Sequence, residues 1–317
     1  MANDAKKNLP HKGHSHTGIC LVRKTLLSVV SLLAFSNLSS AQGRIDCSAI
    51  KSRILQRAVR YCVMLPADYD KERDKKYPVL YFLHGLGENE QALMRSGGWG
   101  LIEDLQGEHK VGDFLMVAPE GRGGFFINAA DGRDRYSDFL LTEFLPFIET
   151  HYRVIRNRKS RGATGLSMGG FGALRLAFAH PELFGSVSAQ SPALITETPT
   201  QLNADLRNAG PLARLLASVF GNPIDVAHWK QNNPFVLVRK NQVQIKTQII
   251  YVNCGHQDEY GFAVGASQMH KQLLSEGIRH EFHLYPGRHS ADYFLSHLGE
   301  TIEFHWNAFA RGEQKVK

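Results

Sequence analysis

The chain has 317 residues, of which 43% are hydrophobic and 21% are charged, a composition typical of a folded globular protein. Residues 1–41 hold five of the 37 Lys and Arg residues and one of the 30 Asp and Glu residues, so the rest of the chain has 32 basic and 29 acidic residues, a net charge of +3. No basic stripe interleaved with aromatic residues is visible there, and the sequence therefore argues against nucleic-acid binding.

The first 41 residues have the pattern of a secretory signal peptide. Two basic residues precede the apolar run at 25–35, and small residues at 39–41 offer a cleavage site. The apolar run is shorter than the roughly 20 residues that a membrane span needs. We therefore expect residues 1–41 to be removed, and residues 42–317 to form a secreted or periplasmic catalytic domain without stable membrane insertion.

Three cysteines follow this leader. Cys47 and Cys62 lie in two runs that could pair as neighbouring strands at the start of the domain. A disulfide between them would close a loop of about 15 residues and stabilise the fold by roughly 3 kcal/mol on the chain-entropy model. Two separate thiols are the alternative, and the sequence leaves both open. Cys254 is expected at the end of a buried strand.

The first half of the domain predicts three strands and a helix. Residues 54–66 alternate and end at a proline, which indicates a strand. The runs at 77–83 and 114–119 are continuously apolar, which is typical of strands buried on both faces. The spacing of apolar residues over 137–152 predicts a helix.

A G-x-S-x-G motif lies between a strand-like run and an apolar helical pattern. Gly165, Ser167 and Gly169 form this motif, and such a turn holds a serine hydroxyl clear of the sheet as a nucleophile. The turn also points the amide of Met168 toward an oxyanion on an attacked carbonyl. The amide of Leu86, in a glycine-flanked loop after a central strand, is the predicted second oxyanion donor.

Strand and helix continue to alternate after the motif, except in one segment. Residues 192–241 contain five prolines and no clear strand, and we expect them to form a small cap over the carboxyl edge of the sheet, with a decorated crossover as the alternative. The alternation indicates an α/β protein with a doubly wound, mostly parallel sheet. The predicted elements are strands at 184–191, 246–254 and 280–285 and helices at 262–277 and 290–310.

Two further side chains complete a catalytic triad. Asp258 and His289 each come directly after a predicted strand. The chain order of Ser167, an acid and a histidine is that of the α/β-hydrolase fold, in which the histidine is the general base and the acid fixes its tautomer.

Each of these partners has a competitor. Glu259 is adjacent to Asp258, and His256 and His283 lie near the site. His283 falls inside a predicted strand, so we expect it to be a core histidine. No metal-ligand spacing, phosphate loop or dinucleotide fingerprint is present, so no metal or cofactor is expected.

The chain resembles the esterase D family of α/β hydrolases, which includes S-formylglutathione hydrolases, feruloyl and acetylxylan esterases and mycolyltransferases. The resemblance extends along most of residues 48–310. The motifs that carry it are Y-F-L-H-G-L-G, G-L-S-M-G-G-F-G-A-L, C-G-x-x-D and Y-P-G-R-H-S. Where relatives often read P-G-G-H, Arg288 precedes the histidine here and adds a charge near the pocket mouth.

The resemblance implies that Ser167 is the nucleophile, His289 the base and Asp258 its partner, with Leu86 and Met168 supplying the oxyanion hole. Together with the signal-peptide pattern, which departs from the cytosolic S-formylglutathione hydrolases, it implies an exported serine carboxylic ester hydrolase for short-chain acyl esters or for acyl and feruloyl groups of polysaccharides. The expected partner is thus a small-molecule or carbohydrate ester. A mycolyltransferase-type acyltransferase and an S-formylglutathione hydrolase-like thioesterase are the alternatives, and the oligomeric state is open.

Overall fold

The computed structural model describes residues 43–205 and 211–313. The predicted signal peptide lies outside the described residues. No helix in the described part is both long and apolar enough to cross a membrane.

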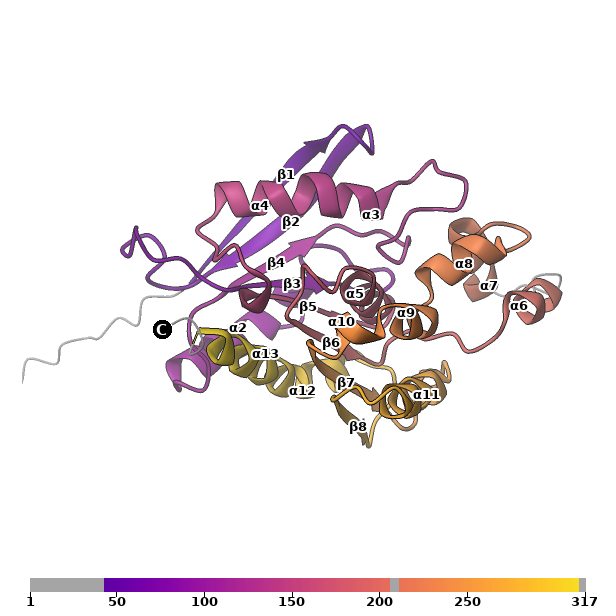
Figure 1. Cartoon of the computed structure of the whole chain (residues 1–317). Helices are drawn as coiled ribbons and strands as arrows, with labels where there is room; N and C mark the ends of the chain where they lie inside the picture. Colours follow the sequence, from indigo (N-terminus) through magenta and orange to yellow (C-terminus); the bar gives the residue numbers. More distant parts are fainter. Residues whose placement is uncertain (1–42, 206–210, 314–317) are drawn as a thin grey trace, which may run out of the picture. The chain divides into compact units, whose positions relative to one another are not determined.

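The centre of the fold is an eight-stranded sheet with the order β1-β2-β4-β3-β5-β6-β7-β8 (Figure 1). β2 runs antiparallel to both of its neighbours, and the strands from β4 to β8 are parallel. The strands are β1 (Arg44–Ser52), β2 (Arg57–Leu65), β3 (Val79–Leu83), β4 (Leu115–Pro119), β5 (Arg161–Leu166), β6 (Ser186–Gln190), β7 (Ile249–Gly255) and β8 (Glu281–Tyr285).

Helices cover both faces of the sheet, and a separate hydrophobic core fills each side. The first core includes residues of α3, α4, α5, α9 and α11, and the second includes residues of α1, α2 and α13 (Figure 1). The helices are α1 (Ala92–Arg95), α2 (Gly98–Gly107), α3 (Tyr136–Phe139), a π-helical segment (Leu140–Phe144), α4 (Leu145–His151), a 3₁₀ turn (Arg158–Ser160), α5 (Met168–Ala179), α6 (Pro199–Asp205), α7 (Pro211–Phe220), α8 (Val226–Asn232), α9 (Pro234–Lys240), α10 (Gln242–Ile245), α11 (Phe262–Ser275), α12 (Ala291–Ser296) and α13 (Leu298–Glu313).

The alternation of side chains along β3 explains why its sequence is continuously apolar. Tyr81 and Leu83 enter the first core, whereas Leu80 and Phe82 enter the second. A strand covered on both faces needs an apolar side chain at every position, since successive residues point to opposite faces. The predicted fold class, an α/β-hydrolase fold with a doubly wound and mostly parallel sheet, is confirmed.

The segment 192–241 contains four helices, α6 to α9, in its described residues. α9 packs against α5 and α11, as a crossover helix does. The end of α7 instead packs against the loop that precedes α3: the amide of Ala130 donates to the carbonyl of Val219 at 2.8 Å, and the Phe125 and Phe220 ring centroids are 6.3 Å apart. The helix expected over 290–310 is divided at His297 into α12 and α13.

The expectation that His283 is a core residue is wrong. β8 is the last strand of the sheet, and His283 is exposed on it, with its ring stacked on Tyr285 at a centroid distance of 5.2 Å. An apolar-looking strand predicts burial only when helices cover both faces, and the sequence does not show which strand lies at the edge.

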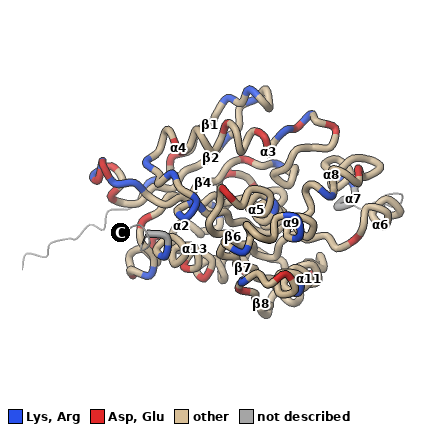
Figure 2. The backbone as a smooth tube through the Cα atoms, viewed as in Figure 1, with Lys and Arg blue, Asp and Glu red and all other residues tan. Residues whose placement is uncertain are grey.

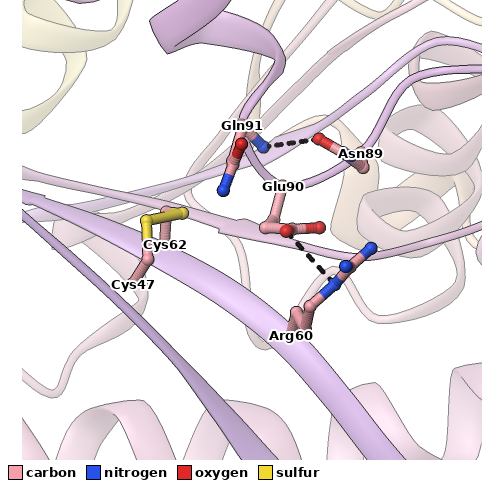
Figure 3. Close-up of a disulfide and its surroundings, with 6 residues drawn as sticks. All are labelled: Cys47, Arg60, Cys62, Asn89, Glu90 and Gln91. Carbon is pink, nitrogen blue, oxygen red and sulfur yellow. Dashed lines mark hydrogen bonds and ion pairs between the residues drawn. A yellow bond between two sulfur atoms is a disulfide. The ribbon is translucent and has the colours of Figure 1, made fainter.

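Cys47 and Cys62 face each other in the register of β1 and β2 and are joined by a disulfide with an S–S distance of 2.04 Å (Figure 3). The structure thus places a covalent cross-link at the antiparallel end of the sheet. Cys254 is a buried free thiol in β7.

Basic and acidic residues are interspersed along the described chain (Figure 2). This distribution agrees with the near balance of 32 basic and 29 acidic residues after position 41.

Candidate active site

The turn between β5 and α5 holds Ser167 in a conformation that non-glycine residues rarely adopt, with φ 55° and ψ −119°. A methyl group on Gly169 would lie 1.9 Å from the carbonyl oxygen of Leu83, and one on Gly165 would lie 2.3 Å from the carbonyl oxygen of Gly169. Neither approach leaves room for a side chain. The glycines of the motif are therefore required by the contact between the turn and β3.

Backbone hydrogen bonds fix this turn against the end of β6. The amide of Ser167 donates to the carbonyl of Gln190 at 2.9 Å, and the carbonyl of Ser167 accepts from the amide of Ala193 at 3.0 Å. Met168 is the first residue of α5. The serine side chain therefore stands where the positive end of a helix dipole begins.

Loops after β7 and β8 bring the predicted acid and histidine to this turn. Nε2 of His289 lies 2.9 Å from Oγ of Ser167, and Nδ1 of His289 lies 2.7 Å from Oδ2 of Asp258. An ionised carboxylate can only accept hydrogen bonds, so Nδ1 of the imidazole is the donor. Nε2 is then free of its proton and accepts the hydroxyl of Ser167.

The carboxylate of Asp258 is fully buried and hydrogen-bonded at both oxygens. Oδ1 accepts the amides of Tyr260 at 3.0 Å and Phe262 at 3.4 Å, while Oδ2 accepts from His289 and from the thiol of Cys254 at 3.8 Å. Burial raises the pKa of Cys254 to about 12. This thiol therefore stays protonated at neutral pH and does not compete as a nucleophile.

Three aromatic rings surround the imidazole of His289 edge-on. The centroids of Tyr260, Phe262 and Phe294 lie 4.9, 5.3 and 5.1 Å from the imidazole centroid. His289 exposes only 10% of its side chain. These contacts restrict the ring and keep water from its edges, while Tyr260 itself remains mostly exposed at the rim.

The loop after β3 runs beside Ser167. A methyl group on Gly85 would lie 3.9 Å from Cβ of Ser167. The buried His84 fixes this loop, since its Nδ1 donates to the carbonyl of Gly85 at 2.8 Å and its Nε2 accepts from the amide of Gly121 at 2.8 Å. Burial lowers the pKa of His84, which keeps the imidazole neutral as this bonding pattern requires. This role of His84 was not predicted, although His84 precedes the predicted oxyanion residue Leu86 by two positions.

An ion pair between a buried carboxylate and a half-exposed arginine anchors the far end of the same loop. Glu90, with 3% of its side chain exposed, has a carboxylate oxygen 3.3 Å from Nε of Arg60 (Figure 3). Arg60 also pairs with Glu120 at 3.2 Å. Arg60 lies in β2, two residues from the disulfide-bonded Cys62. The loop after β3 is therefore tied to β2 and to the end of β4.

The competing residues have other contacts. Glu259 accepts the backbone amide of His289 at 2.9 Å and faces Arg288 at 3.6 Å, but it does not reach the imidazole. His256 is exposed and donates from Nδ1 to the carbonyl of Tyr285 at 3.1 Å. Within the described residues, no group of three or more His, Cys, Asp and Glu side chains is placed to hold a metal ion.

The sheet topology and the strained serine turn define the α/β-hydrolase class. The model of the Esterase family matches residues 52–304, and the chain belongs to this family.

Two curated relatives extend this result. An acetyl esterase from Caldicellulosiruptor saccharolyticus is 25% identical over 260 residues, which cover 80% of this chain and 94% of that protein. An esterase from Mycobacterium tuberculosis is 28% identical over 250 residues, which cover 72% of this chain and 51% of that protein. The chain thus spans about half the length of the mycobacterial relative.

Solved structures share the fold. A ferulic acid esterase superposes with a TM-score of 0.72 at 26% identity, covering 84% of this chain and 99% of that chain. An S-formylglutathione hydrolase from Staphylococcus aureus superposes with a TM-score of 0.68 at 21% identity, covering 84% of this chain and 100% of that chain.

Proposed function

We propose that the protein is an exported serine carboxylic ester hydrolase that acts through an acyl-enzyme. The observation that carries this proposal is the continuous hydrogen-bond chain from Ser167 through His289 to Asp258, with distances of 2.9 and 2.7 Å. Family membership and relatives that are named esterases support it.

In the acylation step, Oγ of Ser167 attacks the ester carbonyl while Nε2 of His289 takes its proton. The buried carboxylate of Asp258 stabilises the imidazolium that forms and does not itself take the proton. The imidazolium then protonates the leaving alcohol oxygen as the ester bond breaks. An acyl ester on Ser167 remains.

In the deacylation step, His289 removes a proton from water, which attacks the acyl carbonyl. The second tetrahedral intermediate collapses, Oγ of Ser167 recovers the proton from the imidazolium, and the carboxylic acid leaves. The amides of Leu86 and Met168 are proposed to donate to the oxyanion in both steps, which in other serine hydrolases is worth about 10²–10³ in turnover per donor.

A small, mostly apolar cavity supports short acyl groups as the first substrates to test. It has a volume of about 80 Å³ and lies between the loop after β3 and α12, with Leu166, Gln190 and Phe294 in its wall. Leu166 precedes the nucleophile, and Phe294 contacts the imidazole. An apolar cavity of about 150 Å³ holds one benzene molecule. This cavity therefore suits an acetyl-sized group, and a feruloyl ring would have to lie on the open rim beside Tyr260.

Export is part of the proposal. The pattern of residues 1–41 supports it, and so does the disulfide between Cys47 and Cys62, since disulfides persist mainly in oxidising compartments. The mature protein recovered from the producing cell should begin after residue 41. N-terminal sequencing checks this directly.

Hydrolysis of p-nitrophenyl esters from acetate to palmitate, together with methyl ferulate, tests the activity. We expect the protein to hydrolyse the acetate fastest and the Ser167→Ala variant to be folded but slower by about 10⁴–10⁶-fold, because removal of the nucleophile abolishes the acyl-enzyme route. Absence of turnover on every ester by folded protein would contradict simple hydrolysis. Product analysis with and without a sugar acceptor would then test acyl transfer.

A further inference from the structure

We propose that Glu259 is a positioning residue that holds the backbone of His289 so that its imidazole reaches Ser167. This inference rests on the function proposed above, because it concerns the base of the same reaction. Glu259 touches neither the imidazole nor the nucleophile. Its role follows from how the loops after β7 and β8 are joined.

Backbone contacts hold these two loops together at their bases. The amide of His256 donates to the carbonyl of Tyr285 at 2.9 Å, and the amide of Gln257 donates to the carbonyl of Gly287 at 3.0 Å. A methyl group on Gly255 would lie 2.6 Å from the carbonyl oxygen of Gly287. The loops therefore run in close contact from the strand ends to position 287.

Beyond Gly287, a side chain continues this contact. Oε2 of Glu259 accepts the amide of His289 at 2.9 Å, and Oε1 of Glu259 lies 3.6 Å from Nη2 of Arg288. The carboxylate thus holds Arg288 and His289 in the loop after β8. The hydrogen bond from the His289 amide lowers the pKa of Glu259.

Two consecutive carboxylates therefore act on one histidine in different ways. Asp258 binds Nδ1 of the imidazole and fixes its tautomer, whereas Glu259 binds the main-chain amide of His289 and fixes where the side chain begins. Displacement of a catalytic group by about 1 Å can cost about 100-fold in rate. A backbone contact of this kind is consequently worth far more in rate than in stability.

Three variants separate the reach of this side chain from its charge. Glu259→Gln keeps the length and an amide oxygen that can accept the His289 amide, Glu259→Asp keeps the charge but is one methylene shorter, and Glu259→Ala keeps neither. We expect the Ala and Asp variants to lose about 10- to 100-fold in kcat, with KM within about twofold. We expect the Gln variant to retain kcat within about threefold of wild type. Glu182→Ala serves as the control, because it removes an exposed carboxylate just before β6, at the end of the parallel strands opposite to the site.

The readouts are ester hydrolysis and the rate at which a fluorophosphonate labels Ser167, which reports activation of the serine by His289 without requiring the natural substrate. Melting temperatures confirm that each variant is folded. Rescue by Gln but not by Asp supports positioning. Equal labelling of wild type and all three variants overturns the inference while the esterase proposal stands, and so does an active Asp variant beside an inactive Gln variant. A wild-type protein that neither labels nor hydrolyses esters overturns both.

Discussion

The turn that carries Ser167 and the loop that carries His289 are held in place by different means. Around the serine, the first turn of α5 lies so close to β3 and β5 that Gly165 and Gly169 admit no side chain. Around the histidine, side chains of a neighbouring loop supply further contacts, through Asp258 and Glu259. Backbone hydrogen bonds fix both segments, but Ser167 also depends on close backbone packing and His289 on side-chain hydrogen bonds, so the two should respond differently to mutation.

Asp258→Asn should cause the largest loss of esterase activity among the substitutions that test this comparison. The asparagine amide can donate toward Nδ1 and favour the wrong imidazole tautomer, which leaves Nε2 protonated and unable to accept from Ser167. We expect kcat for p-nitrophenyl acetate to fall by about 10⁴-fold with little change in melting temperature. An unchanged rate would mean that Asp258 is not the operative carboxylate.

Gly169→Ala tests the steric half of the comparison. The new methyl group would meet the backbone of Leu83 at 1.9 Å, so we expect a loss of about 1–3 kcal/mol or more in the free energy of unfolding, together with a loss of esterase activity. Chemical denaturation measures the first effect.

Gly100→Ala is the matched control, because Gly100 lies within α2 and a methyl group there meets nothing within 4 Å. That variant should gain about 0.5–1 kcal/mol from reduced backbone entropy in the unfolded chain. If both variants behaved alike, close packing would not explain the motif.

Ser167 carries a local sequence signal, whereas the choice between Asp258 and Glu259 as the partner of His289 carries none. The two glycines that admit no side chain each lie two positions from Ser167, so their requirement leaves a local motif. The division of roles between Asp258 and Glu259 depends on contacts with a loop about 30 residues away, and adjacent carboxylates look equivalent in the sequence. His84 and the ion pair of Glu90 with Arg60 escaped prediction because their partners come from distant strands.

The strands show a similar contrast between features that a local pattern predicts and features that depend on the order of strands in the sheet. The buried run of β3 was recognised from its composition, because burial on both faces demands apolar residues throughout. The exposure of His283 followed from the position of β8 at the edge of the sheet, which no local pattern records.

A third region should affect stability without affecting esterase activity. His305 is buried on α13, where its Nδ1 and Nε2 lie 2.8 Å from the hydroxyls of Ser186 and Ser188 on β6. Burial lowers the pKa of His305 from 6.5 to about 3. Between these pH values the unfolded chain binds a proton that the folded chain does not, so stability falls as pH falls, by up to about 1.4 kcal/mol per pH unit.

His305→Leu should remove this contribution of His305 to the pH dependence of stability. We expect the variant to lose about 1–3 kcal/mol at pH 7, because a serine hydroxyl loses its partner, and to depend less on pH between 6.5 and 3. Urea unfolding of both proteins across this pH range checks the slope. An equally steep decline in the variant would assign the acid sensitivity to other groups.

Identification of the acylated residue tests most directly whether Ser167 is the nucleophile. The protein would be mixed with p-nitrophenyl acetate, quenched with acid during turnover, digested and analysed by mass spectrometry. We expect one acetyl group on Ser167 and none on the Ser167→Ala variant. Hydrolysis with no acetyl group on Ser167, or with the acetyl group on another residue such as Cys254, would contradict it.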